Sequence, residues 1–153
     1  MHATTGRNLP QLLGDARRWF EDALLASLEE AGEIHVSPTQ AGLFAVLDDE
    51  GTTVSELARR MGVTRQTAHQ AVHGLVAAGL LEQVPDPSSG RRRLIRRTAE
   101  GERTHRRAEL VLRHVEQELA ARIGDRTVHA LRTALELPWG EPPVLPPPVE
   151  QAR

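Results

Sequence analysis

The spacing of hydrophobic residues predicts helices over most of the chain. Residues 9–31 carry apolar side chains such as Phe20 every three or four positions, which is typical of a helix with one apolar face. The same spacing recurs over 99–123 and, in a shorter form, over 125–137. The helices over 9–31 and 99–123 are long, because globular helices average about 11–12 residues. A domain of this size cannot cover the apolar faces of both by itself.

Capping motifs mark three further helix starts in the middle of the chain. Gln40 follows Ser37 by three residues and Glu56 follows Thr53 by three, which is the spacing of a capping box. Thr64 is placed to cap a third helix that ends near Gly79. These signals predict three short helices between the two long ones.

The last two short helices are separated by a turn at Gly62, which predicts a helix-turn-helix. Residues 80–85 and 91–97 then have strand character, and the Pro, Ser and Gly residues of 86–90 are typical of a turn. A hairpin that directly follows a helix-turn-helix is a wing. We therefore predict a mainly α fold with a small β-hairpin wing: a winged helix-turn-helix domain joined to a helical dimerisation region.

Composition excludes several classes of protein. A chain of 153 residues with 39% apolar content fits one globular domain with an extra helix or tail. The absence of cysteine excludes disulfides, thiolate catalysis and sulfur-bound metal. No apolar run reaches the roughly 18 residues of a membrane span and no signal peptide is visible, so we expect a cytoplasmic protein without a membrane partner. Motifs of hydrolases, P-loops and dinucleotide sites are missing, which predicts no enzyme activity and no cofactor.

The charge is unevenly distributed along the chain. Residues 1–56 hold 3 arginines against 10 acidic residues, whereas residues 59–107 hold 11 arginines against 4. Five of these arginines fall within seven residues, and they are Arg91, Arg92, Arg93, Arg96 and Arg97. Like charges at this density repel one another, so we expect counter-charge from outside the chain, as nucleic-acid phosphates supply it.

The stretch SELARRMGVTRQTAHQAVHGLVAAGLLEQVPDPSSGRRRLIRRTAEG resembles winged-helix transcription factors of the multiple-antibiotic-resistance regulator (MarR) family. The resemblance covers about residues 10–136 and rests on ELA, a short turn, a recognition helix, GLL, a DxR-type wing tip and an LTxxG-like end. Two positions depart from the pattern: Ser89 replaces the acid of DxR, and Arg97 replaces the leucine of LTxxG and adds charge beside the wing.

The resemblance implies a homodimer whose interface is built by the first helix and the last two. We accordingly divide the chain into four parts. Residues 1–36 belong to the dimerisation region, 37–98 form the winged DNA-binding domain, 99–137 form the C-terminal dimerisation helices, and 138–153 form a proline-rich flexible tail.

The second helix of the helix-turn-helix is expected to enter the major groove of duplex DNA. Ala68, Val72, Leu75 and Val76 are assigned to its inner face. The outward side chains are Arg65, Gln66, His69, Gln70 and His73. Arginine and glutamine make bidentate contacts to guanine and adenine, and Thr64, Thr67 and the helix N-terminus are suited to phosphates. The competing interpretation is a solvated polar helix face.

The wing arginines are expected to contact the DNA beside that groove. Arg91 suits the narrow minor groove, and Arg92, Arg93 and Arg96 suit the flanking phosphates. The competing interpretation is a solvated loop. His69 and His73 are also spaced for zinc, but no third ligand is near in sequence, so we expect no metal site.

The family resemblance further implies a small aromatic or phenolic effector bound between the dimerisation helices and the DNA-binding domain. Residues in the corresponding segments are Arg17 or Arg18, Trp19, Phe20, His35 and Phe44. Interface or core packing is the favoured alternative for Trp19 and Phe20. The acidic run 48–50 is expected to be a solvated turn.

These observations predict a sequence-specific DNA-binding transcriptional regulator, a ligand-responsive repressor acting as a homodimer on a pseudo-palindromic operator. The alternative is a winged-helix module for protein–protein assembly, in which the arginines meet an acidic protein. A helical enzyme with an unrecognised site is a further alternative. The sequence shows no set of catalytic residues that would support it.

Overall fold

A computed structural model describes residues 6–147 of the chain. Over this range the elements are α1 (Leu9–Glu30), α2 (Pro38–Val46), α3 (Val54–Met61), α4 (Arg65–Ala77), β1 (Leu81–Asp86), β2 (Ser89–Arg97), α5 (Ala99–Ile123) and α6 (Asp125–Glu136). The predicted class, mainly α with one antiparallel hairpin, is confirmed. The chain divides into two compact units after Glu116, inside α5.

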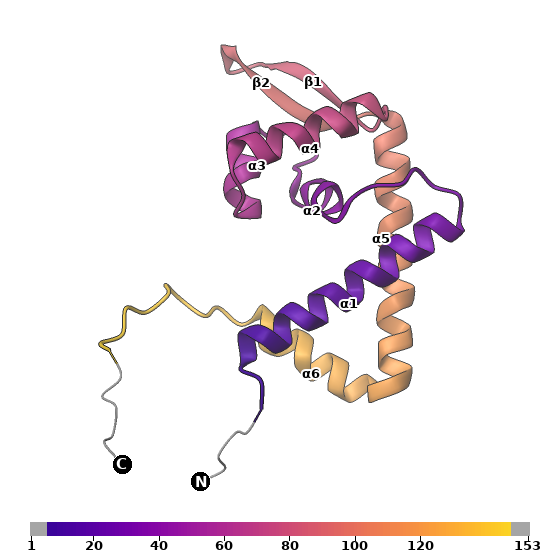
Figure 1. The fold of residues 1–153 in the computed structure, drawn as a ribbon, viewed down its shortest axis with the longest axis vertical. Coiled ribbons are helices and arrows are strands. Elements are labelled where there is room, and N and C mark those ends of the chain that lie inside the picture. The colour runs from indigo at the N-terminus through magenta and orange to yellow at the C-terminus, as the bar shows by residue number, and fades with distance from the viewer. Residues whose placement is uncertain (1–5, 148–153) are drawn as a thin grey trace. The chain divides into compact units, whose positions relative to one another are not determined.

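The core of the first unit lies where α2, α3 and α4 meet the base of the hairpin, as Figure 1 shows. Leu43, Leu57, Leu75, Leu80 and Ile95 are almost completely buried there. Helix–turn–helix and wing therefore share one apolar core. This sharing holds α4 and the hairpin in a fixed relation to each other.

The hairpin contains an irregularity at its outer end. Regular antiparallel pairing runs from Leu81 opposite Arg97 to Pro85 opposite Arg93, after which the register shifts and Asp86 pairs with Ser89. Residues 90–92 are consequently extra residues on β2 that have no partner on β1. Such a bulge interrupts the regular ladder, and Arg91 and Arg92 fall within it.

Thr52 adds a short third pairing to the hairpin. Its amide donates to the Ile95 carbonyl at 2.9 Å and its carbonyl accepts from the Ile95 amide at 2.8 Å. The preceding Gly51 has a φ of +111°, a conformation that L side chains rarely adopt. The segment before α3 is thereby fastened to the wing.

The helix starts follow the local sequence closely. Ser37 and Gln40 form the predicted capping box, and Thr64 caps α4. Thr53 caps α3, but the reciprocal half of the predicted box is absent because the Glu56 carboxylate bonds arginine side chains instead. Gly62 ends α3 in the left-handed conformation with a φ of +66°.

The predicted inner face of α4 needs one correction. Ala68, Val72 and Leu75 are buried as expected, but Val76 is 38% exposed and Ala71 is buried in its place. Ala71 packs into the core that α4 shares with its neighbours, and a small side chain suits that close approach. The exposed face of α4 therefore includes Val76 at its C-terminal end.

The start of α5 is attached to the end of α4. The Thr98 hydroxyl donates to the Gly79 carbonyl at 2.6 Å and caps α5 by accepting from the Gly101 amide. A Cβ atom at Gly101 would lie 2.0 Å from the Leu80 carbonyl oxygen, so only glycine permits this contact.

The second unit consists of the last turns of α5, helix α6 and the segment after it. Helix α6 has no buried residue, and Leu131 and Leu135 on its apolar face are 41% and 47% exposed. The Trp139 indole N–H donates to the Ala134 carbonyl at 3.2 Å. Residues 148–153 of the predicted tail, like residues 1–5 of the predicted N-terminal part, lie outside the described residues. Among described helices, none is both long and apolar enough to cross a bilayer.

Candidate nucleic-acid interface

One face of α4 carries the polar side chains that the sequence assigned to the major groove. Arg65, Gln66, His69, Gln70 and His73 are all exposed. At the start of the helix, the Thr64 hydroxyl accepts from the Thr67 amide at 3.1 Å and lies 2.9 Å from the Thr67 hydroxyl. The face is thus free of the protein's own packing and open to solvent.

A groove of about 500 Å³ separates this helix from the wing and the start of α3. Its arginine lining comes from three elements: Arg59 on α3, Arg65 on α4, and Arg92 and Arg93 on β2. His69 also lines it. Four guanidinium groups around one groove make a site of positive potential, which attracts phosphate groups. Arg59 is a contributor that the sequence analysis did not single out, although its place beside the helix-turn-helix was visible.

The five arginines of the wing segment divide into two classes. Arg91, Arg92 and Arg93 are exposed, and no ion pair to them is recorded within the described part of the chain. Arg96 pairs with Glu82 across the hairpin at 2.7 Å. These three therefore have the greatest need of the external counter-charge that the sequence predicted for all five. Arg92 also lies close enough to Asp86 to lower the pKa of that carboxyl, after the hydrogen bonds from Ser88.

Arg97 departs most from its predicted role. Its side chain is 3% exposed and forms ion pairs with Asp49 and with Glu102, the latter at 2.7 Å. Its guanidinium also donates to the Leu47 carbonyl at 3.4 Å. Arg97 is an internal cross-link and adds no charge to the wing surface, because two carboxylates neutralise it.

The acidic run at 48–50 is exposed, as expected of a solvated turn, and two of its carboxylates also form ion pairs. Asp48 binds both terminal nitrogens of Arg60 at 2.9 Å, and these hydrogen bonds lower the pKa of the Asp48 carboxyl. Asp49 pairs with Arg97. Asp48 and Asp49 thus connect the turn after α2 to α3 and to the last residue of β2 while their own side chains stay exposed.

Glu56 places one negative charge in the arginine-lined groove. Hydrogen bonds from Arg59, and then from Arg60, lower the pKa of the Glu56 carboxyl to about 2. The carboxylate is therefore ionised at all physiological pH values. It holds Arg59 and Arg60 in place, and it also offsets part of the positive potential that phosphates experience.

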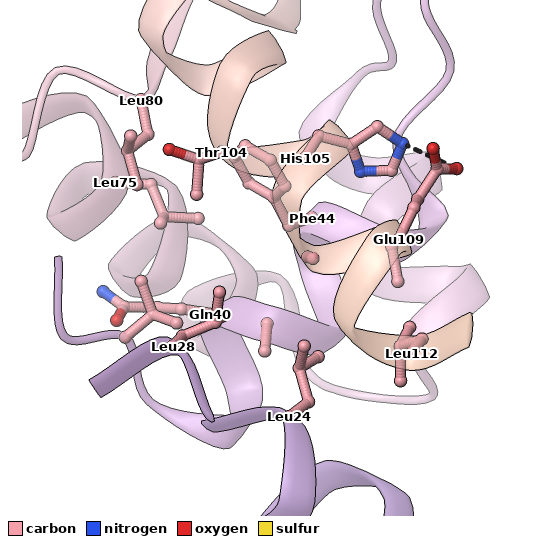
Figure 2. A pocket seen from close by; sticks show the side chains of 14 residues that line it. Leu24, Leu28, Gln40, Phe44, Leu75, Leu80, Thr104, His105, Glu109 and Leu112 are labelled. Atoms are coloured by element: carbon pink, nitrogen blue, oxygen red, sulfur yellow. Dashed lines mark ion pairs between the residues drawn. The ribbon is translucent and has the colours of Figure 1, made fainter. Parts of the chain in front are cut away.

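An apolar cavity of about 90 Å³ lies between α1, α2, α4 and α5, within the first unit (Figure 2). Most of its lining residues are aliphatic, and the others are Phe44, Gln40, Thr104, His105 and Glu109. Helix α5 forms one wall of the cavity, and the sequence analysis named none of its residues as ligand contacts. The apolar spacing of α5 was visible, but its contact with α2 was not.

The predicted effector residues are not gathered at this cavity. Phe44 lines it, whereas Arg17 and Phe20 line a hollow of about 660 Å³ beside it, between α1, α2 and α3. The two spaces share Leu24, Ala41, Ala45 and Leu112 as lining residues. Trp19 packs edge-on against Phe20 with ring centroids 5.1 Å apart. His35 lines neither space. One predicted residue of the five thus belongs to the cavity, and Trp19 and Phe20 pack on each other.

Glu33 fixes the connection between α1 and α2 against α5. Its carboxylate is 7% exposed and pairs with Arg103 at 3.1 Å and Arg107 at 3.2 Å. His69 and His73 lie on the exposed face of α4, and the described residues contain no group of three His, Cys, Asp or Glu side chains arranged to hold a metal ion.

Comparison with known proteins adds independent information. Residues 34–92 match a family model described as MarR family. The fold matches wild-type MarR from E. coli with a TM-score of 0.71 at 20% identity, covering 86% of this chain and 96% of that one. A search of curated proteins finds no match.

Two further solved structures are similar over most of their length. A Mycobacterium tuberculosis MarR family protein, Rv2887, in complex with salicylic acid, shares 25% identity with a TM-score of 0.66 and coverages of 87% and 97%. The transcriptional repressor CouR bound to a 23-mer DNA duplex shares 22% identity with a TM-score of 0.69 and coverages of 87% and 93%.

Proposed function

We propose that this chain is a MarR-family transcriptional regulator that binds DNA, rather than an enzyme, and that it acts in the cytoplasm as a homodimeric repressor of a pseudo-palindromic operator, released by a small effector. The observation that carries this proposal is the arginine-lined groove between α4 and the wing. It joins the two elements that a winged helix applies to neighbouring grooves of a duplex.

Base recognition is assigned to the exposed face of α4. Gln66 and Gln70 suit adenine and Arg65 suits guanine, and each bidentate contact discriminates by about 1–3 kcal/mol. His69 and His73 lie on the same face and complete the contact surface. Thr64, Thr67 and the N-terminus of α4 hold phosphates.

Backbone and minor-groove contacts are assigned to the wing. Arg91 lies in the bulge at residues 90–92 and reaches the minor groove, whose negative potential favours arginine. Arg92 and Arg93 line the groove with Arg59 and bind phosphates. Arg96 contributes less, because Glu82 already neutralises it.

The dimer is supported by apolar surface that one chain leaves exposed. Leu131 and Leu135 on α6, Leu110 on α5 and Leu9 and Leu12 on α1 are each more than 40% exposed. A two-fold interface would bury such surface and set two copies of α4 one helical turn of DNA apart. The dimerisation region is accordingly 1–36 with 99–137, and the DNA-binding domain is 37–98.

Effector response is supported by the cavity, since its walls come from both of those regions. An occupant that changes the relation of α1 and α5 to α2 and α4 changes the spacing of the two recognition helices. A coupling of about 1–3 kcal/mol is sufficient to lower operator occupancy.

The experiment that tests this function is binding to the chain's own promoter DNA across a salt series, with Arg91→Ala beside the wild type. We expect nanomolar, steeply salt-dependent affinity that Arg91→Ala weakens. Arg113→Ala on α5 is the matched control and should leave affinity unchanged. A folded dimer that fails to bind at low salt would favour the alternative of a protein-assembly module.

A further inference from the structure

Two arginines and two carboxylates form one connected network between the end of α2 and the arginine-lined groove. Arg60 of α3 binds both carboxylate oxygens of Asp48 at 2.9 Å, and its NH1 group also donates to the Val46 carbonyl at 2.8 Å. Its Nε atom donates to Glu56 at 3.0 Å. Arg59 donates to the same carboxylate through Nε at 2.9 Å and through NH2. The network therefore runs from the last residue of α2 to Arg59.

The two arginines differ in what they are left to bind. Arg60 uses four of its five N–H groups in these bonds, and its side chain is 29% exposed. Arg60 is not among the residues that line the groove, whereas Arg59 is. The Arg59 side chain is 72% exposed, and its NH1 group makes no hydrogen bond to any of the described residues. Arg59 thus keeps one edge of its guanidinium available to an anion in the groove.

Net charge does not account for what the network adds to the groove. The hydrogen bonds from Arg59 and Arg60 lower the pKa of the Glu56 carboxyl to about 2, and the bonds from Arg60 lower the pKa of Asp48. Both carboxylates are therefore ionised at neutral pH and balance the two guanidinium groups. Long-range attraction for phosphates comes from the other arginines of the groove. What the network supplies is a fixed direction for the Arg59 guanidinium.

The pair of Glu56 and Arg59 would hold that direction poorly by itself. An isolated exposed ion pair contributes little, because water competes for both groups and two long side chains lose rotamer freedom. Arg60 changes this, since it binds Glu56 from the other side and is itself held by the end of α2 and the following turn. A guanidinium that is held before binding loses less conformational entropy when it meets a phosphate, and its planar fork suits phosphate oxygens.

We propose that Arg60 is a positioning residue for DNA binding, which acts through Glu56 to hold the Arg59 guanidinium in place for a backbone phosphate. Arg59 is the contact, and Arg60 does not touch the DNA. The inference rests on the proposed function in taking DNA as the source of the phosphate. The competing interpretation is that these ion pairs only fasten α3 to the end of α2, and the experiments below separate the two.

The first test is a double-mutant cycle in binding of the full chain to its own promoter DNA, measured by fluorescence anisotropy at one salt concentration. Arg60→Lys keeps the charge, but its single nitrogen cannot span Asp48 and Glu56 as the guanidinium fork does. We expect it to weaken binding about two- to tenfold for each protomer that contacts DNA. In the Arg59→Ala background it should cause no further loss. Equal losses in both backgrounds, or no loss in the wild type, would overturn the proposal.

Arg103→Lys is the matched control. Arg103 also bonds two carboxylates, Glu100 and Glu33, and fastens α5 to the connection between α1 and α2, but it does not line the groove. Arg103→Lys removes the same kind of fork and should leave promoter affinity unchanged. Thermal melts followed by circular dichroism compare the stability of the variants. A loss of affinity in Arg103→Lys as large as that in Arg60→Lys would contradict a specific role of Arg60.

The second test needs no DNA and follows the Arg59 side chain directly. Heteronuclear NOE measurements report the rigidity of each arginine Nε–Hε group, and the Arg59 signal is the one that disappears in Arg59→Ala. We expect this group to be rigid in the wild type and in Arg103→Lys, and mobile in Arg60→Lys. An Arg59 group that is mobile already in the wild type, or equally rigid in Arg60→Lys, would overturn the proposal.

The two tests separate this inference from the proposed function. A folded wild-type dimer that does not bind promoter DNA would reject the proposed function, and the Nε–Hε measurement would still decide whether Arg60 orients Arg59. Normal promoter binding with no coupling between Arg60 and Arg59 would reject the positioning role alone.

Discussion

The guanidinium of Arg97 lies 5.9 Å from the centroid of the Phe44 ring, at the point where the wing, the turn before α3 and the start of α5 meet. Phe44 also forms part of the cavity wall. Arg97, the last residue of β2, thus contacts Phe44, which a ligand in the cavity would also touch.

Replacing Arg97 tests whether its charge or its packing matters more. Arg97→Ala removes the contact with Phe44 and leaves a void, so we expect a loss of about 2–3 kcal/mol in the free energy of unfolding. Arg97→Leu keeps an apolar body and removes the buried charge, and we expect a change within about 1 kcal/mol. Urea denaturation at fixed protein concentration measures both. Equal losses in the two variants would show that the ion pairs dominate.

Arg92 and Arg96 provide a matched pair on one strand for the salt dependence of DNA binding. Each phosphate contact contributes about 0.9 to the slope of log affinity against log salt. Arg92→Ala should lower the slope by about that amount for each protomer that contacts DNA. Arg96→Ala should change it less, because Glu82 holds Arg96 at 2.7 Å. Fluorescence anisotropy over a salt series gives both slopes, and a larger effect of Arg96→Ala would refute the division of the wing arginines.

Acid should weaken the fold partly through Glu56. The pKa of this carboxyl falls from 4.5 to about 2 in the folded protein, because Arg59 and then Arg60 hydrogen-bond to it. A lowered folded-state pKa means that the stabilisation is present above pH 4.5 and is lost as the pH falls toward 2. Glu56→Gln should therefore lose less stability than the wild type on going from about pH 6 to pH 3. Urea midpoints at these two pH values measure the difference, and identical acid sensitivity would contradict it.

The unpartnered hydroxyl of Thr104 predicts a stabilising substitution. Thr104→Val exchanges a buried hydroxyl that makes no hydrogen bond for a methyl group of similar size. We expect a gain of about 1 kcal/mol in the free energy of unfolding without ligand. Thr104→Ser, which keeps the hydroxyl and deletes the methyl, is the control and should destabilise. A loss of stability in Thr104→Val would indicate that the hydroxyl has a partner in solution.

The proposed dimer depends on the apolar face of α6. Leu131→Asp places a charge on that face, which one chain leaves 41% exposed, and should shift the protein to monomer and abolish tight operator binding. Thr133→Asp puts the same charge on the opposite side of the helix and should leave the dimer intact. Sedimentation velocity distinguishes the two, and an unchanged dimer in Leu131→Asp would place the interface elsewhere.

The sequence by itself determined the elements that depend on near neighbours. Ser37 and Thr64 cap their helices through amides three residues ahead, and Gly62 ends α3 through its own backbone conformation. The polar face of α4 follows from helical periodicity, and the hairpin follows from turn chemistry between two segments of strand character. These contacts span a few residues, so the local pattern contains all the information they need.

Only the tertiary structure decided which arginines remain available and where the cavity lies. Arg97 is neutralised by Asp49, 48 residues earlier, and its place at the leucine position of LTxxG does not reveal that partner. Ala71 rather than Val76 is buried on the inner face of α4, and this depends on how closely the neighbouring elements approach the helix. Thr104 and Phe44 meet at one cavity because α5 packs beside α2. Burial and ion pairing between distant segments arise only when the chain packs. The physical reason is that packing brings together residues that lie far apart in the sequence, and local sequence patterns do not show which of them will meet.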